Sequence, residues 1–232
     1  GCVAGSGIDT IELTGDVTLV EALPTVTQGA IFEGGGFTVG RYPTAPDFRI
    51  LDLDVGGTVE LRDIKIVNGA ASDGGGIRRN DGQLTLFNAT VSGNEATSRG
   101  GGIYGTFSSD AISITASTIS DNTASLGGGI YSGFGGTMVI NNSTVSGNAA
   151  TSNGGGIYNV MYNYLTITNS TISGNVSGDR GGGLYNQFYA GDIDLVNTTV
   201  IGNSAVEGGG VYGYPVFAAT PQGHYTEIFL DN

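Results

Sequence analysis

Residues 144–158 are Thr-Val-Ser-Gly-Asn-Ala-Ala-Thr-Ser-Asn-Gly-Gly-Gly-Ile-Tyr, and close copies of this stretch recur along the chain. A Gly triplet followed by an aliphatic residue begins at Gly74, Gly100, Gly127, Gly154, Gly181 and Gly208, at a nearly constant spacing. A degenerate copy, Gly34-Gly35-Gly36-Phe37, lies upstream. One such unit cannot bury its apolar side chains alone, whereas stacked units can. The repeat therefore predicts a solenoid.

Apolar and polar residues alternate within each unit, as in Leu84-Thr85-Leu86 and Thr90-Val91-Ser92. Alternation with period two indicates half-buried strands, and no segment shows a sustained helical period. We expect two clear strands per unit and a third at the Gly triplet with its Ile-Tyr. Parallel crossovers are nearly always right-handed. The sequence predicts an all-β fold, a right-handed parallel β-helix with coils of about 27 residues.

Two residue types form columns in step with the repeat. An Asn column ends the second strand and is expected to form a structural amide ladder between coils. It contains Asn94, Asn122, Asn148, Asn175 and Asn203. A Tyr column follows the Gly triplets and is expected to form an aromatic stack. It contains Tyr104, Tyr131, Tyr158, Tyr185 and Tyr212.

The regularity of the repeat divides the chain into three parts. Residues 1–63 are expected to form irregular N-terminal coils and a partial cap of the same solenoid, and residues 64–212 the regular coils. Residues 213–232 are expected to be a tail or a final strand. Exposed strand edges at the two ends could pair with other copies, which predicts self-association end to end into a filament. The alternative is that the chain is a segment of a longer repeat protein.

Composition excludes several functions. The chain has 8 basic and 21 acidic residues, a net charge of −13, and Lys65 is its single Lys. Nucleic-acid binding depends on Lys and Arg, so we expect no nucleic-acid partner. No apolar stretch is long enough for a membrane-spanning helix, so no direct membrane span is expected. Cys2 is the single cysteine and cannot form an internal disulfide.

The Gly-Gly-Gly-aliphatic motif, paired with the Ser-Gly-Asn of residues 92–94, 146–148 and 173–175, resembles the repeat of polymorphic outer-membrane proteins. Residues 7–13 also look like the first strand of bacterial surface β-helix proteins. The resemblance implies a secreted or cell-surface protein of adhesin or autotransporter-passenger type. The resemblance implies no catalytic residues, because proteins with these repeats share none.

The loops after each third strand vary in sequence and carry aromatic side chains. Variable loops on a rigid scaffold are a common place for binding. We define the aromatic loop edge as Phe107, Phe134, Tyr162, Tyr164, Phe188 and Tyr189. These side chains could stack on a cell-surface glycan or contact a protein, and they could equally fold over the solenoid and cover its core.

Evidence for catalysis in the sequence is thin. The acid pairs Asp52/Asp54 and Asp192/Asp194 each share a strand face, but neither pair recurs on adjacent coils. His224 is the sole His and has no evident partner. We predict no catalytic residue, no metal site and no cofactor. The sequence favours an extracellular structural or adhesive solenoid, with a carbohydrate-binding or polysaccharide-cleaving β-helix as the alternative.

A minor alternative comes from the outward residues of the second strand. These are Thr90 and Ser92, Thr118 and Ser120, Thr144 and Ser146, Thr171 and Ser173, and Thr199. A flat hydroxyl array of this kind resembles an ice-binding surface, although Thr is also common in strands because of its intrinsic β propensity.

Overall fold

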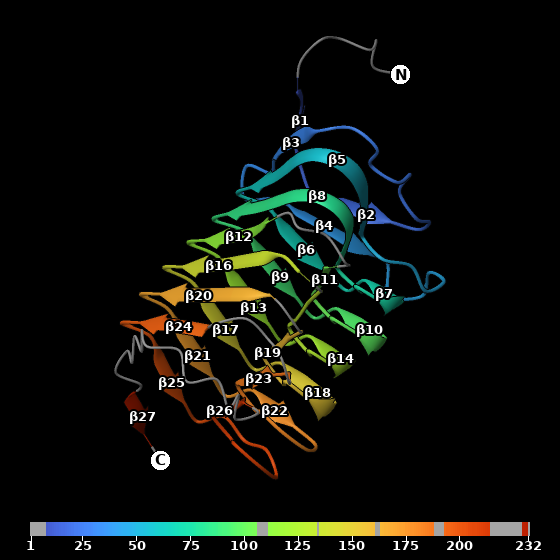
Figure 1. Ribbon diagram of the computed structural model, residues 1–232. Helices are drawn as coiled ribbons and strands as arrows, with labels where there is room; N and C mark the ends of the chain where they lie inside the picture. The colour runs from blue at the N-terminus through green and yellow to red at the C-terminus, as the bar shows by residue number, and fades with distance from the viewer. Residues whose placement is uncertain are drawn as a thin grey trace.

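The computed structural model describes residues 8–105, 111–133, 135–160, 163–187 and 193–213, and the backbone of 229–231. All strand pairs in this part of the chain are parallel, and each strand pairs with its copy in the next coil (Figure 1). Ile130 pairs with Ile157 and Ile157 with Leu184, so the register advances by one full repeat at each step. The predicted all-β parallel solenoid, with one repeat to each coil, is confirmed.

The described strands form three sheets. Sheet A contains β1 (Asp9–Glu12), β3 (Ala30–Glu33), β5 (Leu51–Arg62), β8 (Ile77–Phe87), β11 (Ile103–Gly105), β12 (Ala111–Thr115), β15 (Ile130–Ser132), β16 (Thr137–Asn141), β19 (Ile157–Asn159), β20 (Tyr164–Thr168), β23 (Leu184–Asn186), β24 (Ile193–Val196) and β26 (Val211–Gly213). Sheet B contains β2 (Val17–Leu19), β4 (Thr38–Arg41), β6 (Lys65–Val67), β9 (Thr90–Ser92), β13 (Thr118–Ser120), β17 (Thr144–Ser146), β21 (Thr171–Ser173), β25 (Thr199–Ile201) and β27 (Phe229–Asp231). Sheet C contains β7 (Ala70–Asp73), β10 (Glu95–Arg99), β14 (Thr123–Leu126), β18 (Ala149–Asn153) and β22 (Val176–Ser177).

The expectation of three strands per coil was wrong, because a regular coil has four. The additional strands are those of sheet C, directly after the Asn column. Their inward positions hold small residues, Ala96, Ala124 and Ala150, which are 3–5% exposed. An Ala does not stand out as a core residue in an alternating pattern, so periodicity alone missed this strand.

The core consists of aliphatic columns that run through the middle of the stack. Ile103, Ile130, Ile157 and Leu184 are 0% exposed, and each lies directly over the next in sheet A. The inward aliphatic residues of β12, β16 and β20 in sheet A and of β13, β17 and β21 in sheet B complete the interior. Burying one such side chain contributes roughly 1.5–3 kcal/mol, so the repeated columns supply most of the driving force for stacking.

The Gly triplets are required by backbone geometry. The first Gly of each has a positive φ, +64° at Gly127, which L side chains rarely adopt. A Cβ on the second, Gly128, would lie 2.3 Å from the Ala149 carbonyl oxygen in the next coil. The triplet is therefore a turn that brings sheet C close to sheet A.

The asparagine ladder is buried beside these turns. Asn122 is 0% exposed, and its Nδ2 donates to Asn148 Oδ1 at 2.9 Å and to the Val91 carbonyl oxygen at 3.0 Å. The Asn122 backbone N–H also donates to Asn148 Oδ1 at 3.0 Å. The same hydrogen bonds recur from Asn94 through Asn175 to Asn203. Each amide thus contacts the coil before it and the coil after it.

The N-terminal coils depart from this regularity. Strands β5 and β8 are 12 and 11 residues long and run as curved ribbons where later coils have two separate strands (Figure 1). Residues 42–50, between β4 and β5, form no strand, which matches the longer interval between Gly34 and Gly74. Among the described residues there is no helix that could cross a membrane.

Candidate functional site

Five of the six residues of the aromatic loop edge, Phe107, Phe134, Tyr162, Phe188 and Tyr189, lie outside the described residues. Tyr164 is described. It begins β20, pairs with Thr137 of β16 and is 55% exposed. Its ring is therefore available for contact with another molecule, and the use of the edge in binding stays a prediction.

The tyrosine stack, Tyr104 through Tyr212, runs along β11, β15, β19, β23 and β26. Successive ring centroids are 5.3, 5.1, 4.8 and 5.5 Å apart. Tyr104, Tyr158 and Tyr185 are buried, and burial raises the pKa of Tyr104 and of Tyr131. Aromatic pairs at such distances contribute roughly 0.5–1.5 kcal/mol each beyond their buried area. The stack is thus a structural ladder between coils.

Two arginines cover the stack near its two ends. The Arg99 guanidinium lies 4.8 Å from the ring centroid of Tyr104 and 5.6 Å from that of Tyr131. It also makes two hydrogen bonds to Asp73, at 2.8 and 3.2 Å. The hydrogen bonds to Asp73 raise the Arg99 pKa further above its ordinary value. Arg99 therefore joins an ion pair to a cation–π contact.

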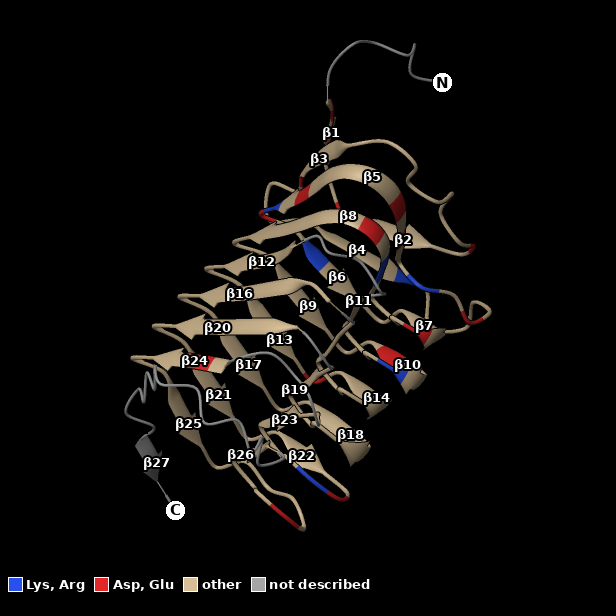
Figure 2. Ribbon diagram, in the orientation of Figure 1, with Lys and Arg blue, Asp and Glu red and all other residues tan. Residues whose placement is uncertain are grey.

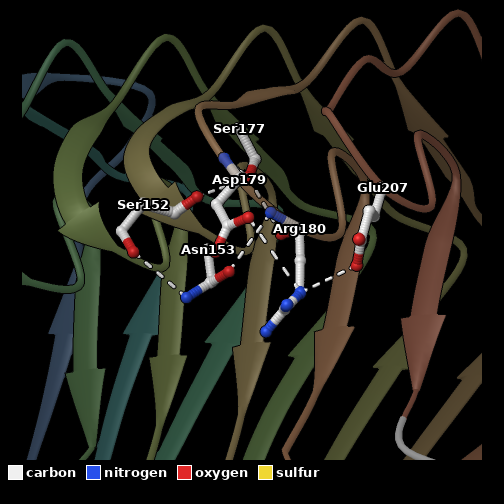
Figure 3. Close-up of polar contacts among 6 residues, drawn as sticks. All are labelled: Ser152, Asn153, Ser177, Asp179, Arg180 and Glu207. Atoms are coloured by element: carbon white, nitrogen blue, oxygen red, sulfur yellow. Dashed lines mark hydrogen bonds and ion pairs between the residues drawn. The ribbon is translucent and has the colours of Figure 1, made fainter.

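Arg180 also joins an ion pair to a cation–π contact at the other end, and Figure 3 shows its polar contacts. Its guanidinium lies 5.3 Å from the Tyr212 ring centroid, and Arg180 Nε donates to Glu207 Oε2 at 2.9 Å. The turn that carries it is fixed by Asn153 Oδ1, which accepts from the Arg180 backbone N–H at 3.1 Å. Ser177 Oγ lies 2.6 Å from the Ser152 carbonyl oxygen and accepts from the Asp179 backbone N–H.

These arginines belong to one column in register, the residue before each Gly triplet. The column runs Asp73, Arg99, Leu126, Asn153, Arg180, Glu207. Arg99 pairs with the acid of the preceding coil and Arg180 with the acid of the following coil. Sequence analysis missed this pattern, although comparing the residues that precede the triplets would have revealed it.

A hollow with charged walls lies on the N-terminal coils, and we term it the N-terminal groove. Its volume is about 450 Å³. It is lined by Ala22, Leu23, Thr25, Asp47, Phe48, Arg49, Asp52, Ala70, Ala71, Ser72 and Arg78. A second hollow of about 320 Å³ shares Asp47 and residues 70–72 and extends toward Glu95 and Thr97. The two form one surface beside sheet C.

Asp52 is the centre of the polar contacts in the N-terminal groove. It accepts hydrogen bonds from Arg78 at 2.7 and 2.8 Å, from Arg49 at 3.2 Å and from Thr25 at 3.2 Å. Burial opposes ionisation of Asp52, but the Arg78 hydrogen bonds and the charges of both arginines outweigh it, so the pKa of this carboxyl lies below its usual range. A carboxylate held ionised in this way positions its partners and is poorly suited to general acid catalysis.

Of the acid pairs in the sequence, Asp52 and Asp54 lie on the outward side of β5, with Asp54 exposed, and Asp192 lies outside the described residues. No group of three or more His, Cys, Asp or Glu is arranged to hold a metal ion in the part of the chain that the structure describes. Arg49 and Arg78, the two arginines bonded to Asp52, were not identified as site residues from the sequence, and Arg78 comes from the next coil.

Charge is distributed unevenly along the stack (Figure 2). Seven of the eight basic residues precede residue 100, and Arg180 is the eighth. Residues 100–178 contain only two charged residues, Asp110 and Asp121. This middle part of the stack is therefore rich in Thr, Ser, Asn and Gly and nearly uncharged.

Three parallel sheets around aliphatic and asparagine ladders define the class of protein as a parallel β-solenoid. Comparison with protein-family models matches residues 52–216 to a family described as right handed beta helix region. The match covers more than half of the chain, and the chain belongs to this right-handed β-helix family. The family includes enzymes, among them pectate lyases and glycoside hydrolases, as well as non-enzymes. Searches of curated proteins and of solved structures found no match. The closer resemblance to polymorphic outer-membrane-protein repeats stays a prediction.

Proposed function

We propose that this chain is a secreted or cell-surface structural solenoid of adhesive type. The observation that supports the proposal best is the set of ladders in the regular coils. In these ladders the Asn, Tyr and aliphatic residues of one coil contact the equivalent residues of the next coil. Parallel hydrogen bonds and buried amides that repeat from coil to coil resist separation of the coils under load. Such a rod suits a role as a spacer that holds a contact surface away from the cell.

The contact surface that we propose for adhesion is the aromatic loop edge around Tyr164. Exposed aromatic rings stack on sugars and bury well in protein contacts. The purified chain would be tested on an array of cell-surface glycans and on cell-surface protein extracts. Tyr164→Ala should weaken the binding. Tyr42→Ala is the matched control, because Tyr42 is 49% exposed and lies on the N-terminal coils. Equal binding by the wild type and both variants would contradict the use of this edge.

End-to-end association is a further part of the proposal. In the described residues, β2 and β27 at the two ends of sheet B each pair with one neighbour only, and unpaired strand edges are templates for pairing with another chain. Electron microscopy of the purified chain at several concentrations should show filaments that lengthen with concentration. Dispersed single particles at every concentration would reject self-association.

Carbohydrate binding in the N-terminal groove is the second candidate. The observation that favours it is the combination of Phe48 with the Arg49–Asp52–Arg78 cluster, an aromatic ring beside bidentate polar groups. Calorimetric titration with neutral and acidic polysaccharides should detect binding that Arg49→Gln weakens and Arg62→Gln, which pairs with Glu33 and Glu60 outside this groove, does not. New reducing ends in the same mixtures would show cleavage, and absence of both binding and cleavage would remove this candidate.

A further inference from the structure

Sheet B carries a flat, regular surface that the proposed function does not use. Its outward side chains along β9, β13, β17, β21 and β25 form a Thr column and a Ser column, which together we term the threonine–serine face. The Thr column is Thr90, Thr118, Thr144, Thr171 and Thr199. The Ser column is Ser92, Ser120, Ser146 and Ser173, with Ile201 in the fifth rank.

The two columns form a lattice with two fixed repeats. Adjacent parallel strands are about 4.8 Å apart, and residues two apart on one strand are separated by roughly 6.6 Å. No register shift interrupts the pairing from β9 to β25. Beneath the face, Val91, Ile119, Val145 and Ile172 are 0–1% exposed and hold the strands in place. Thr also has a restricted χ1 angle, so its methyl and hydroxyl positions repeat with the backbone.

The Thr and Ser side chains of this face lie on the outward side of sheet B. Thr90, Thr118, Thr144 and Thr171 are half-buried, as are the four Ser residues, and Thr199 is exposed. None of the nine side chains makes a hydrogen bond to another residue in the described part of the chain. A hydroxyl can donate one hydrogen bond and accept two, so the face offers its full bonding capacity to whatever covers it.

The face is also free of charge. Lys65 precedes it in the rank of β6, and Asp121 follows Ser120 at the turn, but none of the ten positions from Thr90 to Ile201 is ionisable. In a chain of net charge −13, a neutral face is complementary to a neutral occupant. A single glycan chain repeats along one direction only, whereas this face repeats along two. The occupant that fits is a neutral, flat lattice with hydrogen-bonding groups.

We propose that the threonine–serine face binds the surface of ice. Water molecules bonded to a rigid array of hydroxyls are held at the spacing of that array, and an ordered water costs little entropy where its partners are already fixed. Thr methyl groups between the hydroxyls restrict how these waters can reorient. A layer of water ordered in this way joins the lattice of an ice crystal, and the protein is thereby adsorbed to it. This inference does not depend on the proposed adhesive function.

The test is to grow single ice crystals in solutions of the purified chain. We would measure thermal hysteresis, the gap between the melting and freezing temperatures, together with crystal shape. The wild type should facet the crystals and produce a measurable gap. Thr144→Tyr, at the centre of the face, should lose most of the gap because the ring lifts the ice surface from neighbouring ranks.

Thr166→Tyr is the matched control. Thr166 is a half-buried outward residue in the middle of β20, on sheet A, so the substitution is chemically the same but lies on another face. It should keep the wild-type gap. Circular dichroism would verify that both variants are folded, and Thr118→Tyr, one coil away from Thr144, would replace Thr144→Tyr if that variant does not fold.

Two results would overturn the inference. One is unshaped ice and no hysteresis with the folded wild-type chain. The other is an equal loss in Thr144→Tyr and Thr166→Tyr, which would place the activity elsewhere. If ice is unaffected while Thr144→Tyr abolishes binding to a neutral polysaccharide, the face is a glycan surface and ice binding is rejected.

Discussion

Residues 8–99, which comprise the N-terminal coils and the first regular coil, and the regular coils of residues 111–187 are stacked in the same sheets but held together by different chemistry. At the position of the tyrosine stack, the first two ranks are Asp52 and Arg78, which form an ion pair. From Tyr104 onward the same column is aromatic. Farther along sheet A, Arg62 pairs with Glu33 and Glu60. Where the repeat is irregular, opposite charges join neighbouring coils. Where it is regular, identical side chains do so, with the Arg180–Glu207 pair as an exception.

This difference has a physical reason. A ladder of identical residues requires a side chain that is attracted to its own copy, as amides and aromatic rings are. Like charges in register repel one another, so charged positions can link coils only when the sign changes from one coil to the next. Residues 111–187 accordingly hold only three charged residues, Asp121, Asp179 and Arg180, and the neutral threonine–serine face is one result.

The largest expected effect is at the Gly triplets of the regular coils. In Gly128→Ala the new Cβ would lie 2.3 Å from the Ala149 carbonyl oxygen and 2.5 Å from that of Gly155, both backbone atoms. Because backbone cannot move aside without breaking the ladders, we expect a loss of roughly 4 kcal/mol or failure to fold. Gly56→Ala, on β5, meets nothing within 4 Å and should change the free energy of unfolding by less than about 1 kcal/mol. Urea denaturation compares the two, and equal losses would contradict the role of the triplet.

Breaking the asparagine ladder should have the next largest effect. Asn148→Ala removes the acceptor of two Asn122 hydrogen bonds and the donor to Ile119 and Asn175. Buried groups left without partners cost roughly 1–3 kcal/mol each, so a total loss of about 3 kcal/mol is expected from denaturation curves. Asn169→Ala is the control, because Asn169 is exposed and the same position in another coil is Ala116. A loss in the control as large as in Asn148→Ala would rule out a special role for the ladder.

Acid should weaken the N-terminal coils through Asp52. Its folded pKa is below the ordinary value of about 3.9, so its stabilisation is fully present above that pH and is lost as the pH falls through the folded pKa. The side chain is 18% exposed and solvent screens the pair, so we expect a loss of about 1 kcal/mol below pH 4. Thermal melts of the wild type should drop as the pH falls below about 4, and Asp52→Asn should flatten that part of the curve. An unchanged pH profile in the variant would show that Asp52 contributes nothing.

The sequence was sufficient to predict the fold because the constant length of the repeat fixes which side chains meet in neighbouring coils. It was not sufficient for sheet C, whose inward residues Ala96, Ala124 and Ala150 lack the size that marks a core strand. The pairs of Arg99 with Asp73 and of Arg180 with Glu207 are single departures from the repeat. Because neither pair recurs from coil to coil, the repeat pattern does not predict them. The groove around Asp52 depends on an irregular loop, residues 42–50, for which no repeat supplies a template.

The most direct test of this account is hydrogen–deuterium exchange of the whole chain, analysed by peptide at pH 7 and at about pH 3. We predict that peptides from residues 111–187 remain protected at both values, because amide and aromatic ladders carry no charge. After correction for the intrinsic exchange rate, which is itself far lower at about pH 3, peptides from residues 30–99 should show smaller protection factors at the lower pH because carboxylates lose their charge. If the regular coils lose protection first, or if both regions open together, the ladders are not what holds the regular coils and the account is wrong.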